Sequence, residues 1–263
     1  MRVGILGIAG RMGQELVAQA RAAGHDVIGG TLNPASARAY RNGIPTLGLP
    51  DLAGQSDVVI DFTHADAVAE HARVLSTGRA AWVLGTTGIA PEQQLQVEAA
   101  SHRIAVLQAA HFGLGINLLM TVARQLAAIL PAETYDAEIV EMHHRQKVDA
   151  PSGSALLLGQ AVAEGRGTTL AAVMESGRDG HCGARATGAI GFASLRGGQI
   201  VGEHSLSFTA LGEQITLSHR AFDRNIFAAG AMRAAAWLVG RPPGLYGIDE
   251  MLDLRPARGH DCQ

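Results

Sequence analysis

The sequence has little of what a secreted, membrane-spanning or disulfide-built protein needs. Only two of its 263 residues are cysteines, Cys182 and Cys262, which excludes a disulfide framework. No apolar run reaches the roughly 20 residues of a transmembrane helix. The N-terminal apolar stretch meets Arg11 too early for a signal peptide. We therefore expect a reduced, cytoplasmic chain with no membrane partner, in which Cys182 has no activating neighbour and is inert.

Charge is also scarce. Charged residues make up 17% of the chain, and the formal net charge is −3. No global field would attract nucleic acid or an anionic membrane, so any anion must be bound by a local cluster of cations. Aromatic residues make up only 4%, whereas hydrophobic residues make up 47% and glycine occurs 33 times. This composition is typical of an α/β protein with Val/Ile-rich strands and glycine-built turns.

The first half of the chain alternates between short apolar runs and helical patterns. Strands are expected over residues 2–6, 26–32, 56–62, 80–84 and 104–109, and helices over 13–23, 66–76 and 91–101. Strands that alternate with helices of about ten residues predict βαβ units and a parallel sheet.

The pattern changes after Asn117. A helix is expected up to Leu130, then a strand over 137–142, a helix from Ser152, and a run of strands over 190–220. Apolar and polar side chains alternate in the last of these strands, which favours a sheet with one wet face. This part of the chain is predicted to be α+β, and a further helix is expected from Asp223 to Val239.

A glycine loop joins the first expected strand to the first expected helix. Gly7, Gly10 and Gly13 are spaced GxxGxxG, and each has a function in a dinucleotide site: a tight turn, close approach of a pyrophosphate, and close packing of helix on strand. The free N–H groups of the helix would then face the phosphates. The acid expected about 20 residues later is replaced by Asn33, so the sequence leaves NADH and NADPH both open.

Two further loops follow expected strands. Phe62-Thr63 follows the third strand and Gly85-Thr86-Thr87 the fourth. Ligands of parallel sheets bind outside the carboxyl ends of the strands, which makes these loops candidates for the same nucleotide site. Each could equally be an ordinary turn.

The stretch Glu141–Ala155 contains a dense local cluster of cationic and imidazole side chains. His143, His144, Arg145 and Lys147 lie within five positions, and Ser152-Gly153-Ser154 opens the next expected helix. An ammonium group beside helix N-terminal N–H groups is suited to a carboxylate. Adjacent strand residues point to opposite faces and no thiol or HExxH spacing is present, so no metal site is expected.

These residues resemble the signature of the 4-hydroxy-tetrahydrodipicolinate reductase (dihydrodipicolinate reductase) family. The resemblance extends over nearly the whole chain. It includes the run from Glu141 to Ala155 and the segments Gly10–Gly13, Ile60–Thr63, Gly85–Gly88, Gly188–Phe192 and Val201–His204.

The resemblance implies an N-terminal Rossmann-like domain, rejoined by the C-terminal segment, and an α+β domain that binds substrate and makes a homotetramer. The expected domains are residues 1–115 with 224–263, and residues 116–223. The implied reaction is NAD(P)H-dependent reduction of 4-hydroxy-tetrahydrodipicolinate, by way of dihydrodipicolinate, to tetrahydrodipicolinate in lysine and diaminopimelate biosynthesis. The implied substrate is therefore a small cyclic dicarboxylate.

The resemblance also assigns roles. His143 would be the general acid and Lys147 would place its ammonium on a substrate carboxylate, with His144, Ser152, Gly153 and Ser154 in the substrate site. The residues expected to bind the nucleotide are Gly7, Ile8, Ala9, Gly10, Arg11, Met12, Gly13, Asn33, Phe62, Thr63, Gly85, Thr86, Thr87, His111 and Phe112.

The chain departs from the family pattern in two places. Asn33-Pro34 stands where an acid and a base are common, and His111-Phe112-Gly113 stands where Asn-Phe-Ser is usual. A different imine or semialdehyde oxidoreductase on the same two-domain plan would explain the glycine loop but not the carboxylate site. A nucleotide-sensing regulator would need a basic DNA-binding segment, which the sequence does not show.

Overall fold

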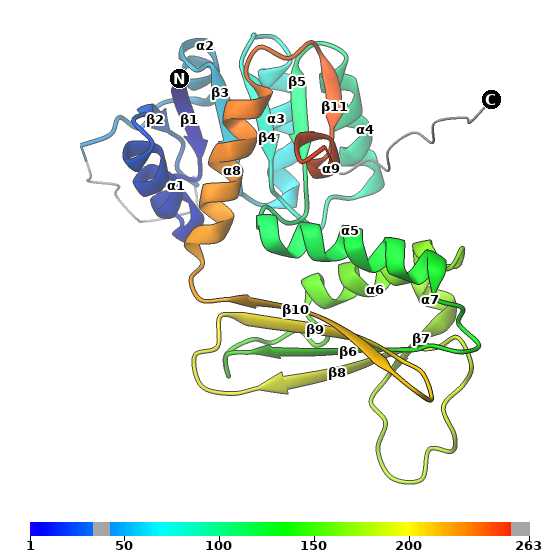
Figure 1. Cartoon of the computed structure of the whole chain (residues 1–263). Coiled ribbons are helices and arrows are strands. Elements are labelled where there is room, and N and C mark those ends of the chain that lie inside the picture. The colour runs from blue at the N-terminus through cyan, green and yellow to red at the C-terminus, as the bar shows by residue number, and fades with distance from the viewer. Residues whose placement is uncertain (34–42, 254–263) are drawn as a thin grey trace, which may run out of the picture. The chain divides into compact units, whose positions relative to one another are not determined.

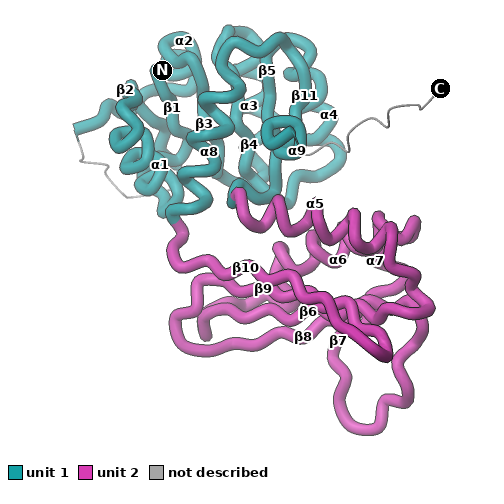
Figure 2. The backbone as a smooth tube through the Cα atoms, viewed as in Figure 1, with its two compact units in different colours: residues 1–113, 225–263 teal, residues 114–224 magenta. Residues whose placement is uncertain are grey.

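The structure, a computed structural model, describes residues 1–33 and 43–253, so Pro34 and Cys262 lie outside the described residues. The chain forms two compact units (Figure 2). Unit 1 consists of residues 1–113 and the segment from Asn225 onward, and unit 2 consists of Leu114–Arg224. Within the described ranges, no helix is long and apolar enough to cross a bilayer.

Unit 1 is built on a parallel sheet in the order β11-β5-β4-β3-β1-β2 (Figure 1). The strands are β1 (Arg2–Leu6), β2 (Asp26–Gly30), β3 (Val58–Asp61), β4 (Ala81–Leu84), β5 (Ala105–Gln108) and β11 (Gly244–Tyr246). The chain leaves β1 for β2 on one side and then crosses to β3 on the other. The strand order therefore reverses at β1, the place where doubly wound sheets bind their ligands.

Both faces of this sheet are buried. On one face, α1 (Arg11–Ala22) and α8 (Asn225–Leu238) pack on alternate strand residues such as Ile5 and Ile60. On the other face, α2 (Leu49–Gln55), α3 (Val68–Leu75) and α4 (Pro91–Ser101) cover Val59 and Trp82. Continuous apolar runs such as the fully buried β3 are what a parallel sheet covered on both faces requires.

Unit 2 contains a mixed sheet in the order β10-β9-β6-β8-β7. The strands are β6 (Asp136–His143), β7 (Met174–Ser176), β8 (Ile190–Arg196), β9 (Gly202–Thr209) and β10 (Gln214–Ala221). The helices are α5 (Leu114–Ile129), α6 (Gly153–Gly165) and α7 (Leu170–Val173), and α5 and α6 lie on one side of the sheet (Figure 1).

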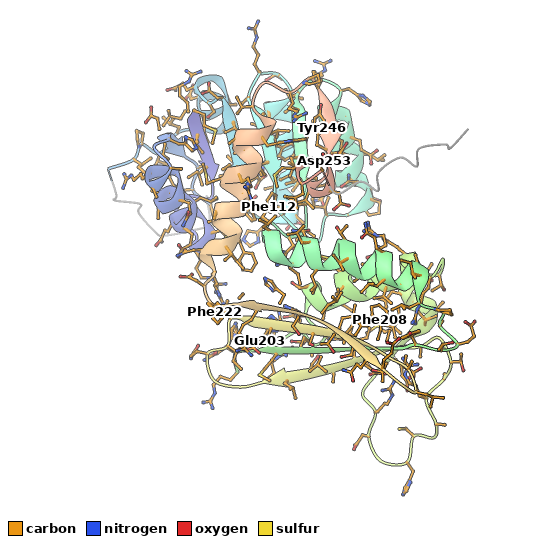
Figure 3. All side chains as sticks on the ribbon, viewed as in Figure 1. Phe112, Glu203, Phe208, Phe222, Tyr246 and Asp253 are labelled. Carbon is orange, nitrogen blue, oxygen red and sulfur yellow. The ribbon has the colours of Figure 1, made fainter. Side chains whose placement is uncertain are left out.

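Alternation along β6 and β9 separates the two faces of this sheet. Ile139, Leu206 and Phe208, the last labelled in Figure 3, point into the core under the helices. Glu141 and His143 continue the same inward-facing row of β6, since every second residue of the strand is buried. The row that packs the core therefore also presents two polar side chains at its carboxyl end.

The α/β architecture with a second α+β unit agrees with the expected fold class, but several short elements were not expected. The sequence pattern did not predict α2, α7, β7, β11 or α9 (Ile248–Met251), which span three to seven residues each. A segment of this length is too short to display a helical or strand period. The helix expected over 66–76 begins as a 3₁₀ turn at Ala65–Ala67 and becomes α3 only at Val68.

Candidate active site

The glycine loop after β1 makes the close contacts that its spacing predicts. Gly7 adopts a φ of +69°, a conformation that other residues rarely take. The Gly10 N–H donates to the Gly7 carbonyl at 2.9 Å. A Cβ atom on Gly13 would lie 2.5 Å from the Gly7 carbonyl oxygen, so only glycine lets α1 pack this tightly on the loop. Gly10 caps α1 without a side-chain hydrogen bond, which leaves the first N–H groups of the helix for a phosphate.

A cavity of about 520 Å³ opens beside this loop, at the carboxyl ends of β1, β2 and β3. Six of the residues predicted to bind the nucleotide line it: Gly7, Ala9, Gly10, Asn33, Phe62 and Thr63. Thr31, Leu32, His64, Asp66, Ala67 and His71 complete the lining. The Thr31 hydroxyl accepts from the Gly7 N–H at 3.2 Å and its carbonyl accepts from the Ile8 N–H at 3.0 Å, which joins the ends of β1 and β2.

The remaining residues predicted for the nucleotide do not line this cavity. Ile8 and Gly13 are buried under it, and Arg11 and Thr87 are exposed. Gly85 is required for packing, because a Cβ atom there would lie 2.2 Å from the Phe62 ring. Phe62 in turn packs edge-on against the buried Phe112 at 5.3 Å between ring centroids, and His111 packs edge-on against Phe227 at 4.8 Å. Met12 packs at the margin of the core that contains Ile8.

A buried carboxylate at the end of β3 organises two of these loops. Asp61 is fully buried and accepts from the Thr63 N–H at 3.1 Å, the Thr63 hydroxyl at 2.7 Å and the Thr86 hydroxyl at 3.3 Å. Its other oxygen lies 2.7 Å from Nδ1 of His71 on α3. Thr86 therefore helps to hold the loop after β3 and does not line the cavity. Asp61 lies in the Ile60–Thr63 segment that resembles the family, but its sequence context predicts no function for it.

The second cluster lies in unit 2, where β6 ends. Glu141, 1% exposed, accepts from both terminal nitrogens of Arg196 at 2.9 and 2.8 Å. One of its oxygens lies 2.6 Å from His143 Nδ1, and the other accepts from the Ser152 N–H at 3.1 Å. A single carboxylate thus connects the expected general acid, an arginine of β8 and the residue that begins α6.

Ser152 is the N-cap of α6, as the sequence predicts. Its hydroxyl accepts from the Ala155 N–H at 3.3 Å and lies 3.2 Å from Nε2 of His204 on β9. The His204 ring lies 5.2 Å from the His143 ring between centroids. Gly153 is exposed and Ser154 is half-buried, so the start of α6 is open on this side.

Lys147 and His144 already have partners within unit 2. The Lys147 ammonium donates to both carboxylate oxygens of Asp149 at 2.8 Å. Arg224 lies 3.0 Å from Nε2 of His144, and because a guanidinium can only donate, this ring nitrogen is the acceptor. The proton of that neutral ring is then on Nδ1, which is buried and makes no hydrogen bond within the described part of the chain. A buried donor of this kind ordinarily has an acceptor.

The pKa values of Glu141 and His143, the two ionisable groups at the end of β6, are shifted by different causes. Burial alone would raise the pKa of Glu141, but the hydrogen bonds from Arg196 and His143 lower it to about 2. Burial lowers the pKa of His143 below its ordinary value of 6.5, and the neighbouring Glu141 opposes this shift. Glu141 is therefore ionised at neutral pH. The stability that this carboxylate contributes is fully present above about pH 4.5 and is lost as the pH falls toward 2.

The sequence alone does not predict roles for Arg196, His204, Arg224 or Glu141 in this cluster. His204 and Glu141 lie in segments that resemble the family, so the resemblance was an available signal for these two residues. Arg196 and Arg224 lie 55 and 80 positions from their partners. No local pattern could have connected them. Among the described residues, no cluster of His, Cys, Asp or Glu has the geometry to bind a metal ion.

A parallel sheet with a glycine loop at its switch point, joined in one chain to a cationic histidine site, defines a two-domain oxidoreductase that uses a nicotinamide dinucleotide. The comparisons with known proteins agree. The family model for the dihydrodipicolinate reductase N-terminus matches residues 1–112, and the model for its C-terminus matches residues 115–252. The chain belongs to the dihydrodipicolinate reductase family.

Individual relatives cover almost the whole chain. The chain is 54% identical over 256 residues to a 4-hydroxy-tetrahydrodipicolinate reductase of Granulibacter bethesdensis, covering 97% of this chain and 98% of that protein. It is 56% identical over 254 residues to the enzyme of the same name from Acidiphilium cryptum, with the same coverage. A solved structure of dipicolinate-bound dihydrodipicolinate reductase from Paenisporosarcina sp. TG-14 superposes with a TM-score of 0.77 at 28% identity, covering 95% of this chain and 98% of that one.

The packing of the glycine loop gives a direct test of the nucleotide site. We expect Gly13→Ala to weaken NADH binding by at least about tenfold, or ~1.4 kcal/mol, because its new methyl group would meet the backbone of Gly7 and Ile8 and displace the loop. NADH fluorescence titration measures the change. Gly54→Ala is the matched control, since a Cβ atom there meets nothing within 4 Å. Equal NADH affinity in the two variants would contradict this account of the loop.

Proposed function

We propose that this protein is a 4-hydroxy-tetrahydrodipicolinate reductase that uses NADH or NADPH to form tetrahydrodipicolinate in lysine and diaminopimelate biosynthesis. The observation that carries the proposal is the cluster at the end of β6. There, the imidazole of His143, the ammonium of Lys147 and the N-terminus of α6 come from one short segment, and these groups are suited to a small dicarboxylate. Support for the substrate comes from the relatives named for this activity and from the solved relative that contains dipicolinate, a cyclic dicarboxylate.

The glycine loop after β1 is suited to a dinucleotide. Gly7 and Gly10 leave no side chain between the backbone and the cavity, Gly13 lets α1 pack closely on the loop, and the start of α1 offers N–H groups to a pyrophosphate. When bound there, the reduced nicotinamide supplies the hydride. Asn33 lines the same cavity and can donate to a ribose without repelling a 2′-phosphate. We therefore propose that the site binds both NADH and NADPH.

The substrate carboxylates are bound in unit 2. Lys147 is the only lysine of the chain, so a compact ammonium occurs at this position alone among many arginines. Its present partner, Asp149, must share or yield the ammonium when a substrate carboxylate arrives. The N–H groups of Gly153 and Ser154 and the buried Nδ1–H of His144 are further donors in this cluster.

His143 provides the proton. Loss of water from 4-hydroxy-tetrahydrodipicolinate gives dihydrodipicolinate. Hydride addition to the conjugated C=C–C=N system of dihydrodipicolinate leaves an electron pair on its enamine portion, and that pair takes a proton from the protonated imidazole. Lowering of the His143 pKa by burial makes the imidazolium a stronger acid. The oxidised coenzyme, the neutral imidazole and tetrahydrodipicolinate balance the reaction.

A coupled assay tests the proposed activity. Dihydrodipicolinate synthase supplies the substrate, and the absorbance of NADH or NADPH is followed in separate reactions. We expect oxidation of both, with a preference below about a hundredfold, because one missing charged contact is worth at most a few kcal/mol. Lack of turnover with either coenzyme in a folded sample would refute the function. A preference above about a thousandfold would refute only the assignment made for Asn33.

Two substitutions separate binding from proton transfer. His143→Ala should lower kcat by about 10²–10⁴-fold, typical of a lost general acid, with a smaller change in KM. Lys147→Ala should chiefly raise KM for the substrate, because it removes a charge-assisted contact. NADH affinity should change in neither variant, since both residues lie in unit 2. Wild-type kcat in His143→Ala would overturn its role.

The single lysine allows the same contact to be observed directly. Reductive methylation with ¹³C-formaldehyde labels only Lys147 and the N-terminal amine, because no other amine exists in the chain. Addition of dipicolinate should shift the Lys147 signal and leave the N-terminal signal unchanged.

We also propose that the protein is a cytoplasmic homotetramer, with the outer face of the unit 2 sheet as the interface. Val140 and Leu195 on this face are 41% and 46% exposed. On the neighbouring strands, Ser205 pairs with Ser218 through their hydroxyls, and the Glu203–Arg220 ion pair lies on the same face. The cytoplasm is where NAD(P)H and a free, exposed thiol such as Cys182 are both maintained.

Light scattering tests this interface. The wild type should have four times the mass of the chain, and Leu195→Asp should have a smaller mass, because a carboxylate without a partner is costly to bury. Leu95→Asp is the control, since Leu95 is an exposed leucine (62%) on α4 of unit 1. A monomeric wild type, or an unchanged mass in Leu195→Asp, would contradict the proposed interface.

A further inference from the structure

Glu141 contacts the proposed general acid, yet it touches neither nucleotide nor substrate in the scheme above. Its carboxylate contacts Arg196, the Ser194 side chain, the Ser152 N–H and His143 Nδ1, and the contact to His143 measures 2.6 Å. Arg196 already provides a bidentate counter-charge. A carboxylate that served only as the partner of this arginine would not need a histidine ring turned toward it.

The orientation of the His143 ring follows from this contact. Because Glu141 is ionised and can only accept, Nδ1 of His143 carries a proton and donates it. Nε2 makes no hydrogen bond to any other described residue, and it faces Gly202 on β9, where a Cβ atom would lie 3.0 Å away. Nε2 is therefore the ring nitrogen from which a proton can leave.

The proton count explains why the contact matters. A protonated His143 that gives up its Nε2 proton becomes a neutral imidazole with its remaining proton on Nδ1. That tautomer needs an acceptor at Nδ1, and Glu141 is the acceptor in place. The charged and titratable groups around His143 are Glu141 on β6, Arg196 on β8, His204 on β9 and Lys147 on the loop. Among these, only Glu141 is an anion, so it alone favours the protonated ring.

We propose that Glu141 is a positioning residue for the reduction: it fixes the His143 ring with Nδ1 inward and Nε2 toward the substrate, and it sustains the protonated form of the ring. The proposal rests on the proposed function of His143. Arg196 keeps Glu141 ionised, and the Ser152 N–H ties the same carboxylate to the start of α6. The acid and the carboxylate-binding helix are thus aligned by one side chain.

The first experiment compares the pH dependence of kcat in the wild type and in Glu141→Gln. In the wild type, kcat should fall as the pH rises through the pKa of His143, because the acid is lost. Without the anion, this falling limb should move to lower pH by about one unit or more. At neutral pH, kcat should fall by about 10–100-fold, with less than about a threefold change in KM for NADH. Glu141→Asp keeps the charge and should restore the wild-type position of the limb.

Glu164→Gln is the matched control, because Glu164 also pairs with an arginine of unit 2, Arg124 at 3.1 Å, but contacts no residue of the cluster. Its pH profile should coincide with that of the wild type. A uniform loss of kcat at every pH in Glu141→Gln, with the limb unmoved, would show that Glu141 is only structural and would overturn the proposal.

The second experiment needs neither catalysis nor a substituted Glu141. In ¹⁵N-histidine-labelled wild type, long-range ¹H–¹⁵N spectra above the pKa of His143 report which ring nitrogen carries the proton, and His143→Gln identifies the signal by its loss. We expect the proton on Nδ1. A proton on Nε2 would overturn the proposal, even if Glu141→Gln failed to fold. An Nδ1 proton in a protein inactive in the coupled assay would instead show that the proposed function is wrong while the positioning is right.

Discussion

The buried carboxylate of Glu141 is the constraint on which the rest of the unit 2 site depends. An ionised carboxylate at 1% exposure would be strongly destabilising alone, and Arg196 neutralises it through a bidentate contact. Loss of one member of such a pair typically costs about 3–5 kcal/mol, a large share of the net stability of a folded chain. Because Glu141 also contacts Ser194, His143 and the Ser152 N–H, the same ion pair fixes the end of β6 and the start of α6.

A buried carboxylate also orders loops in unit 1, but its hydrogen-bond partners are of different types. Asp61 is fully buried at the end of β3, but hydroxyl, amide and imidazole groups surround it instead of a guanidinium. These contacts order the loops after β3 and β4 and attach them to α3. In each unit, a buried carboxylate at or near the carboxyl end of a strand orders the neighbouring loops. The loops predicted to bind ligands are therefore anchored to the two sheets by buried acids.

Much of the fold could be predicted from the sequence because long elements carry a clear period. The α4 helix was expected at the bounds it has, Pro91–Ser101, and β8 likewise at Ile190–Arg196. Elements such as β11 could not be predicted, because three residues show no period and the strand depends on pairing with β5. The Gly7–Gly13 loop and the run from Glu141 to Ser154 were recognisable since their spacing is local.

What the sequence determined by itself was the order of the longer strands and helices, the glycine contacts of the first turn and the chemical character of the histidine loop. Each depends on neighbours within a few positions, where propensity and spacing act directly. Only the tertiary structure decided that Arg196 pairs with Glu141 and that the Lys147 ammonium pairs with Asp149. It also decided that Thr86 donates a hydrogen bond to Asp61 and does not line the cavity. Arg196 and Glu141 lie 55 positions apart and Thr86 and Asp61 lie 25 apart, and no local pattern encodes such distances. Lys147 and Asp149 are only two positions apart, but the conformation of their loop decides whether they meet.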